Sequence, residues 1–154
     1  MIDASTYEIM ETWAAALYAD ATLTALFTDL YGKAADIRIG ASQMPGEEDA
    51  PFIHLMPGGD QTGDAEKVWQ RGVHVVLGVF DREWVTTSWG RNLRSLSFLS
   101  QRAIPELMRV LDRALPGASP SSVETSWLPP DFFPLMEAHL LITINDPRPV
   151  TGRR

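Results

Sequence analysis

Three histidines are the residues of this chain best suited to hold a metal ion or to move protons. His54, His74 and His139 each fall on the less apolar side of an expected β-strand. If those strands are neighbours, three imidazoles converge, and such a set suits a zinc ion with one open coordination position. The alternative is that each ring lies on the solvated face of a sheet, because no ligand-spacing motif such as HExxH is present. We therefore expect no metal and no cofactor, with the histidine face as the alternative site.

Motifs of nucleophilic catalysis and phosphate binding are missing from the sequence. The chain has no cysteine, which excludes disulfides, thiolate metal sites and cysteine nucleophiles. No GxSxG elbow surrounds a serine. The glycine-rich stretch Gly58–Gly63 has neither the Walker spacing nor its Lys-Ser/Thr ending, so we expect it to be a loop. These observations favour a protein that is not an enzyme.

Aromatic residues outside the periodic faces are candidates for a functional surface. Two tryptophans and two phenylalanines fall in expected loops, where they either contact another protein or fold back over the edge of the core. Arginines of the helix that follows the first of these loops can also dock an acidic partner, including another copy of this acidic chain. The residues that we predict at a protein interface are Trp84, Trp89, Arg82, Arg91, Phe132 and Phe133.

Composition indicates one acidic domain. The chain has 154 residues, of which 45% are hydrophobic and 21% are charged, as in ordinary globular domains. We expect residues 1–146 to form a single α+β domain and residues 147–154 to form a flexible C-terminal tail. No basic region followed by an apolar run opens the chain, and the densest apolar stretch, Val73–Phe80, is far shorter than a membrane helix. We therefore expect neither a signal peptide nor a membrane span.

The charge balance limits the partners that electrostatics can attract. There are 13 basic and 20 acidic residues, which gives a formal net charge of −7. An acidic chain has no general attraction for DNA or for anionic lipid. We accordingly expect no membrane partner and no sequence-specific nucleic-acid partner.

Apolar residues at three- to four-residue steps predict two helical regions. The first covers residues 5–31, with a break at Asp20, which falls on the apolar stripe and can cap a second helix. Gly32 follows as a C-terminal glycine. The second region covers residues 91–115, and Pro105 is expected to kink it or to start a fresh helix.

Alternating apolar and polar residues predict the strands of one sheet, and glycine- and proline-rich stretches predict the loops. The expected strands are residues 36–39, 51–56, 67–80, 123–128 and 136–144. The expected loops include residues 57–66 and 81–90. The fold class is thus α+β, with a four- to five-stranded, mostly antiparallel sheet and two main helices packed on one face.

The order of these elements resembles a known family. An opening helix ends in Leu23-Thr24-Ala25-Leu26-Phe27, and a loop with glycine and proline leads to the strand Pro51-Phe52-Ile53-His54-Leu55. A polar loop, the long strand Val73–Phe80 and a second long helix follow. This pattern resembles the tail terminator, or tail completion, proteins of long-tailed bacteriophages. In that family a Pro-Tyr-Ile-like strand follows the first loop, and here Phe52 replaces the tyrosine.

The resemblance implies a non-enzymatic virion assembly protein. Such proteins form a ring, usually of six copies, on the end of the tail tube, where they stop polymerisation and join the tail to the head. Implied partners are further copies of the chain, the tail tube protein and the head or neck connector proteins, with DNA passing through the ring. The implied location is the tail or neck of the virion, after synthesis in the cytoplasm of the host bacterium. An edge strand and protruding loops would make the ring contacts.

Two other interpretations remain open. One is a neighbouring part of the virion, such as a neck or head-closure protein or a minor tail protein. The other is a small metal-dependent enzyme or ligand-binding domain that uses the histidine-bearing face formed by His54, His74 and His139.

Overall fold

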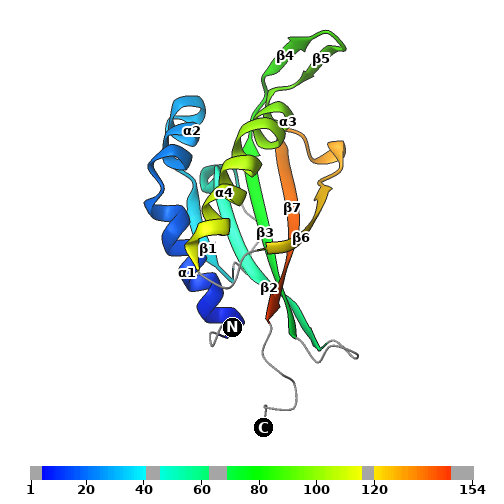
Figure 1. Ribbon diagram of the computed structural model, residues 1–154. Helices are drawn as coiled ribbons and strands as arrows, with labels where there is room; N and C mark the ends of the chain where they lie inside the picture. Colours follow the sequence, from blue (N-terminus) through cyan, green and yellow to red (C-terminus); the bar gives the residue numbers. More distant parts are fainter. Residues whose placement is uncertain (1–4, 41–45, 63–68, 116–119, 147–154) are drawn as a thin grey trace.

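The protein folds into two layers, a five-stranded sheet and a layer of helices on one face of it (Figure 1). The computed structural model describes residues 5–40, 46–62, 69–115 and 120–146, so the tail expected at residues 147–154 lies outside the described residues. The helices are α1 (Thr6–Ala19), α2 (Ala21–Tyr31), α3 (Arg94–Phe98) and α4 (Ile104–Ala114). The strands are β1 (Asp36–Ile39), β2 (Phe52–Thr62), β3 (Trp69–Phe80), β4 (Trp84–Thr87), β5 (Gly90–Leu93), β6 (Pro120–Trp127) and β7 (Leu135–Asp146).

The main sheet has the strand order β1-β2-β3-β7-β6. β1 runs parallel to β2, and all other neighbours in this sheet are antiparallel. β4 and β5 form a separate two-stranded hairpin. The predicted fold class, an α+β fold with a mostly antiparallel sheet and helices on one face, is confirmed.

The core lies between the helices and the covered face of the sheet. Alternate residues of β3, from Val73 to Val79, and of β7, from Ala138 to Ile144, are fully buried there. α1 and α2 contribute large side chains such as Trp13 and Phe27, which are also fully buried. The opposite face of the sheet carries a smaller apolar cluster of Ala50, Phe52, Val76 and Leu135. This second cluster means that the uncovered face is only partly polar.

The break predicted at Asp20 separates α1 from α2. The Asp20 carboxylate accepts a hydrogen bond from the N–H of Leu23 at 2.9 Å and caps α2, because the first amides of a helix have no partner inside it. Its other oxygen accepts a hydrogen bond from Nη2 of Arg109 on α4, also at 2.9 Å. Gly32 ends α2 with a φ of 80°, a backbone conformation that glycine adopts at little cost.

The second helical region differs from the prediction in two respects. It begins at Arg94 instead of residue 91, because residues 90–93 belong to β5. A π-helical turn, Leu99–Ala103, interrupts it directly before α4. Pro105 lies in the first turn of α4 and has no N–H to donate to the preceding turn, which accounts for the interruption that we expected there.

Parts of the two segments predicted as loops are instead strands, and residues 63–66 of the first segment lie outside the described residues. β2 continues through Pro57 to Thr62 and pairs with the start of β3, with a bulge between Pro57 and Gly59. Gly59 has a φ of 92°, a conformation that glycine adopts easily, and it therefore accommodates the bulge. The glycines had instead been interpreted as the end of the strand. Most of residues 81–90 likewise form β4 and the turn of the β4–β5 hairpin, which stands off from the main sheet at the top of Figure 1.

Among the described residues, no helix is both long enough and apolar enough to span a membrane.

Candidate protein interface

The β4–β5 hairpin presents Trp89 at its tip. The turn is organised by Thr87, whose hydroxyl donates to the carbonyl of Gly90 at 3.1 Å and accepts from the N–H of Trp89 at 3.1 Å. Nδ2 of Asn92 donates a hydrogen bond to the Thr87 hydroxyl oxygen at 2.9 Å. Gly90 has a φ of 101°, which a tight turn of this kind requires and other residues rarely adopt. These hydrogen bonds define the turn, and the Trp89 side chain at its tip is 93% exposed.

The base of the hairpin carries a half-exposed aromatic cluster. Trp84 lies against Phe133, with ring centroids 5.9 Å apart, and the guanidinium of Arg91 lies over the Trp84 ring at 5.2 Å. Phe133 directly follows the short 3₁₀ turn η3 (Pro130–Phe132), which contributes the equally exposed Phe132. Trp84 remains 47% exposed, so these rings pack on one another without being covered.

The structure thus brings most of the predicted interface residues together. Trp84, Arg91 and Phe133 lie at the hairpin base, Trp89 lies at its tip, and Phe132 directly precedes Phe133 in the chain. Arg82 lies just before β4 and forms an exposed ion pair with Glu47 at 3.1 Å. Arg91 belongs to the hairpin and not to the arginine-bearing face of the following helix, which corrects its expected element.

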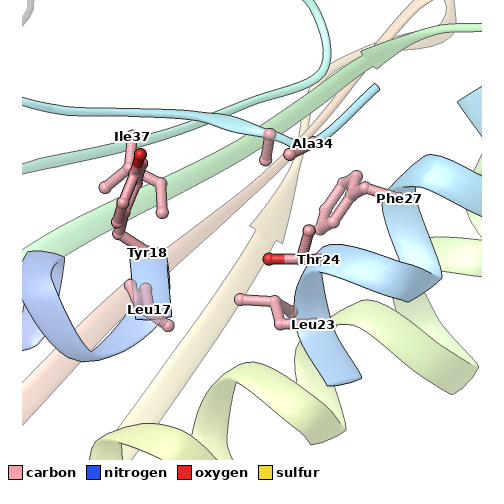
Figure 2. A pocket seen from close by; sticks show the side chains of 8 residues that line it. Leu17, Tyr18, Leu23, Thr24, Phe27, Ala34 and Ile37 are labelled. Carbon is pink, nitrogen blue, oxygen red and sulfur yellow. The ribbon is translucent and has the colours of Figure 1, made fainter. Parts of the chain in front are cut away.

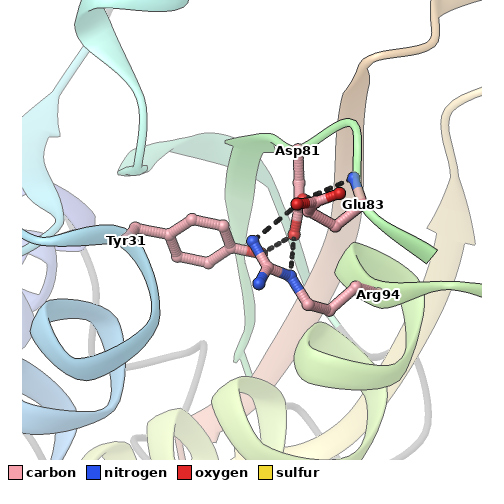
Figure 3. A network of polar contacts seen from close by, with 4 residues as sticks. All are labelled: Tyr31, Asp81, Glu83 and Arg94. Carbon is pink, nitrogen blue, oxygen red and sulfur yellow. Dashed lines mark hydrogen bonds and ion pairs between the residues drawn. The ribbon is translucent and has the colours of Figure 1, made fainter. Parts of the chain in front are cut away.

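A buried polar network fixes the hairpin to the body of the protein (Figure 3). The Asp81 carboxylate accepts hydrogen bonds from Nε and Nη2 of Arg94, at 2.9 and 3.1 Å, and from the hydroxyl of Tyr31 at 2.8 Å. It also accepts from the N–H of Glu83 at 2.9 Å. Asp81 precedes the hairpin, Arg94 follows it and Tyr31 ends α2. One carboxylate therefore joins both ends of the hairpin to the helical layer.

The titrations of Tyr31 and Arg94 reflect this network. Burial, reinforced by the hydrogen bond to Asp81, raises the pKa of Tyr31 far above its usual value. The hydrogen bond to Asp81 also raises the pKa of Arg94 above its usual value. Asp81 consequently faces a neutral hydroxyl and a permanently charged guanidinium at any physiological pH.

The edge strand β6 adds exposed apolar residues that sequence reasoning did not place at an interface. No described strand pairs with its outer side, and all of its residues from Ser121 onward are exposed. Val123 and Trp127 point to the helix side of the sheet but are exposed because the helices do not cover this edge. Residues 123–128 were predicted to form a strand, and β6 covers residues 120–127, but the sequence did not indicate that it lies at an edge of the sheet.

A second feature that the sequence did not reveal is an apolar pocket near the opposite edge (Figure 2). It has a volume of about 250 Å³ and lies between α1, α2 and the segment that leads into β1. Leu17, Leu23 and Phe27 form its floor, and the half-open side is flanked by Tyr18, whose side chain is 79% exposed. Small residues at Ala34 and Ala35 leave the space open, a signal visible only once the elements are placed.

The histidine face brings two of the three histidines into contact. Nε2 of His74 and Nδ1 of His139 are 3.1 Å apart, and Nε2 of His139 is 2.9 Å from the Glu137 carboxylate. A carboxylate accepts, so His139 donates a hydrogen bond from Nε2 to Glu137, and its Nδ1 accepts a hydrogen bond from Nε2 of His74. A carboxylate that orients an imidazole is common in acid–base sites, but here the group beyond the oriented ring is a second imidazole.

The three histidines do not converge, as the alternative interpretation of a metal site required. His54 faces the same side of the sheet, but it pairs with Val76, which separates it from His139 on the far side of β3. Its ring stacks on Phe52 with centroids 4.5 Å apart. Both ring nitrogens of His139 are already hydrogen-bonded. Within the described residues, no three histidine, aspartate or glutamate side chains are grouped to hold a metal ion.

Because the pKa values of His54 and His74 are lowered in the fold, the stability of the fold should depend on pH. Burial lowers the pKa of His54, and burial together with the nearby His139 lowers that of His74. Below the ordinary histidine pKa of about 6.5, the unfolded chain binds protons that the folded chain does not. We expect the free energy of unfolding to fall between pH 7.5 and 5.5, by at most about 1.4 kcal/mol per pH unit for each histidine.

Urea unfolding at several pH values measures this slope. The variants His54→Gln and His74→Gln should each show a shallower slope than the wild type. Ser126→Gln places the same side chain on the same face without removing a histidine, so its slope should match the wild type. An unchanged slope in both histidine variants would contradict the assignment.

Neither a comparison with known protein-family models nor a comparison with curated protein sequences found a match to this chain.

Proposed function

We propose that this chain is a non-enzymatic phage virion assembly protein of the tail terminator type, which forms a ring on the end of the tail tube. The observation that carries the proposal is the set of exposed aromatic side chains around the hairpin, with Trp89 at the tip and Trp84 and Phe133 at the base. Exposed aromatic and arginine side chains are the ones that dominate the energy of protein interfaces.

The element order adds support from a second direction. The opening helices, the strand that begins at Phe52, the long strand β3 and the later helix follow one another in the order on which the resemblance rests. The ring function requires surfaces that meet copies of the chain and surfaces that meet the tube and the head. An unpaired edge strand and a projecting hairpin provide two separate surfaces of this kind.

The positions of the exposed side chains favour head-to-tail association of successive copies of the chain. The hairpin and β6 lie toward one edge of the sheet, and β1 forms the other edge. A contact between unlike surfaces of two copies leaves each copy with a free surface of both kinds, so further copies add until a ring closes. Self-association is therefore the first property to test.

We expect purified protein to assemble in a concentration-dependent manner into a closed ring, with six copies as the expected number. Size-exclusion chromatography with light scattering, from micromolar to millimolar concentration, should reveal a species of six times the 17.1 kDa chain mass. Negative-stain electron microscopy of that species should show rings with a central hole. A chain that stays monomeric over the whole concentration range would overturn the proposal.

A further inference from the structure

The hairpin tip and the apolar pocket are complementary features at different edges of the molecule. Trp89 offers a large apolar side chain with no apolar surface of its own chain to cover it. The pocket offers an apolar floor of Leu17, Leu23 and Phe27 with no side chain filling it. Each feature lacks what the other provides, and the pocket lies at the edge away from the hairpin's aromatic base.

The pocket has room for one indole ring. Its volume is about 250 Å³, whereas a cavity of roughly 150 Å³ already accommodates benzene. An indole also carries one N–H, which needs an acceptor when it is buried. The hydroxyls of Thr24 and Tyr18 are the polar side-chain groups among the lining residues, and either can accept that hydrogen bond.

The charges around the two features are also complementary. From Thr6 to Tyr31 the two helices that frame the pocket carry four acidic residues, Glu8, Glu11, Asp20 and Asp29, and no basic residue. Asp20 is already paired with Arg109, and Lys33 precedes the third wall of the pocket, so Glu8, Glu11 and Asp29 supply the net negative charge. From Trp84 to Leu93 the hairpin carries Arg91 as its only charged residue. Opposite charges attract the two surfaces and also repel the pairing of two pockets. The partner that these observations describe is thus a basic, tryptophan-tipped hairpin, which every copy of this chain has.

We propose that Trp89 of one copy inserts into the pocket between α1, α2 and β1 of the next copy, with Arg91 facing the acidic surface of those helices. This contact would be the interface between neighbouring copies in the proposed ring, so the inference rests on the proposed function. It joins unlike surfaces, and each copy donates one hairpin and receives one. The rigid attachment of the hairpin through Asp81 and Arg94 sets the angle between successive copies, which a ring requires.

Cross-linking tests which surfaces meet, because the chain has no cysteine of its own. Ser88→Cys places a thiol beside the tip, and Tyr18→Cys places one on the exposed flank of the pocket. With both substitutions in one chain, a short bismaleimide should yield a ladder of covalent oligomers. A mixture of the two single variants should stop at dimers. A double variant that gives no products beyond those of the single variants would contradict the contact.

Substitutions test whether the contact drives assembly. Trp89→Ser removes the anchor, and Thr24→Phe fills the pocket; each should weaken association by roughly 30-fold or more, as the loss of an interface hot spot does. Tyr7→Ser removes another exposed aromatic side chain, in the first turn of α1 and outside the pocket lining, and should leave association unchanged. Thermal unfolding of all three variants verifies that they are folded.

A mixture of Trp89→Ser and Thr24→Phe should form a single hairpin–pocket contact between the two variants. Trp89→Ser keeps an intact pocket and Thr24→Phe keeps an intact tip, so a mixture can form one sound contact per pair and should give heterodimers but no ring. A wild-type ring that Trp89→Ser also forms, or that Tyr7→Ser alone abolishes, overturns this inference and leaves the proposed function intact. A wild type that stays monomeric and yields no cross-linked ladder overturns both.

Discussion

Replacing Asp81 with asparagine should destabilise the protein by about 3 kcal/mol. The Asp81 side chain is 1% exposed and makes hydrogen bonds with Arg94, Tyr31 and the backbone of Glu83. Asparagine keeps the shape but removes the charge, which leaves a guanidinium without its carboxylate in a partly buried site. The expected loss lies at the low end of what breaking a buried ion pair costs, because the Arg94 side chain is 32% exposed and water can solvate it.

Glu47→Gln is the matched control for this change. It makes the same chemical substitution in the ion pair with Arg82, where both side chains are more than half exposed. Exposed pairs of this kind contribute about 0–1 kcal/mol, so urea unfolding should separate the two variants clearly. Equal losses for Asp81→Asn and Glu47→Gln would mean that the network contributes no more than a surface pair.

The same substitution should loosen the hairpin. Asp81 joins the residues on both sides of β4 and β5, and the hairpin has few other buried contacts, since most of residues 84–91 are exposed. Amide hydrogen exchange in Trp84–Leu93 should therefore become faster in Asp81→Asn than the global loss of stability explains. In the proposed ring, this loosening would also weaken the contact made by Trp89.

Periodicity predicted the elements whose one face is buried. The apolar stripe of the opening helices, the break at Asp20 and the glycine at position 32 appear in the structure as expected. Side chains of β3 and β7 alternate between the core and the uncovered face, which is why both strands could be predicted from the sequence. The apolar periodicity of these elements arises because one face of each is buried, so the periodicity predicts them.

The hairpin was missed because its strands bury neither face. Every residue of β4 except Val85 is exposed, so the segment has no apolar alternation that could distinguish it from a loop. The extension of β2 was missed for a different reason. Pro57 and two glycines are typical of turns, but pairing with β3 overrides that local preference.

The candidate site depends on contacts that sequence spacing cannot reveal. Trp84 and Phe133 lie far apart in the chain, and Tyr31 is 50 positions from the carboxylate that it contacts. Residue type alone singled out the aromatics and the histidines. The strand order places His74 in contact with His139 and keeps His54 apart from it. The strand order could not be predicted from the sequence.

Replacing Gly78 with valine should destabilise the protein by about 2–3 kcal/mol, although valine ordinarily suits a β-strand. Gly78 pairs with Phe52 across β2 and β3, and the fully buried Phe52 ring occupies the space above the glycine. A Cβ at position 78 would overlap Cζ of that ring. The ring therefore has to leave the cluster that it forms with Val76 and Leu135.

A double-mutant cycle tests this explanation with Phe52→Ala. That change alone should cost about 3 kcal/mol, because it leaves a cavity on the uncovered face. With the ring absent, the valine fills part of the cavity, so the double variant should lose about as much as Phe52→Ala alone and not the sum. Ser126→Val, an exposed change on the same face, should stay within about 0.5 kcal/mol of the wild type. Additive losses in the cycle would show that Gly78 is required for some reason other than Phe52. Coupling would assign Phe52 a packing role on the face that also carries the histidines.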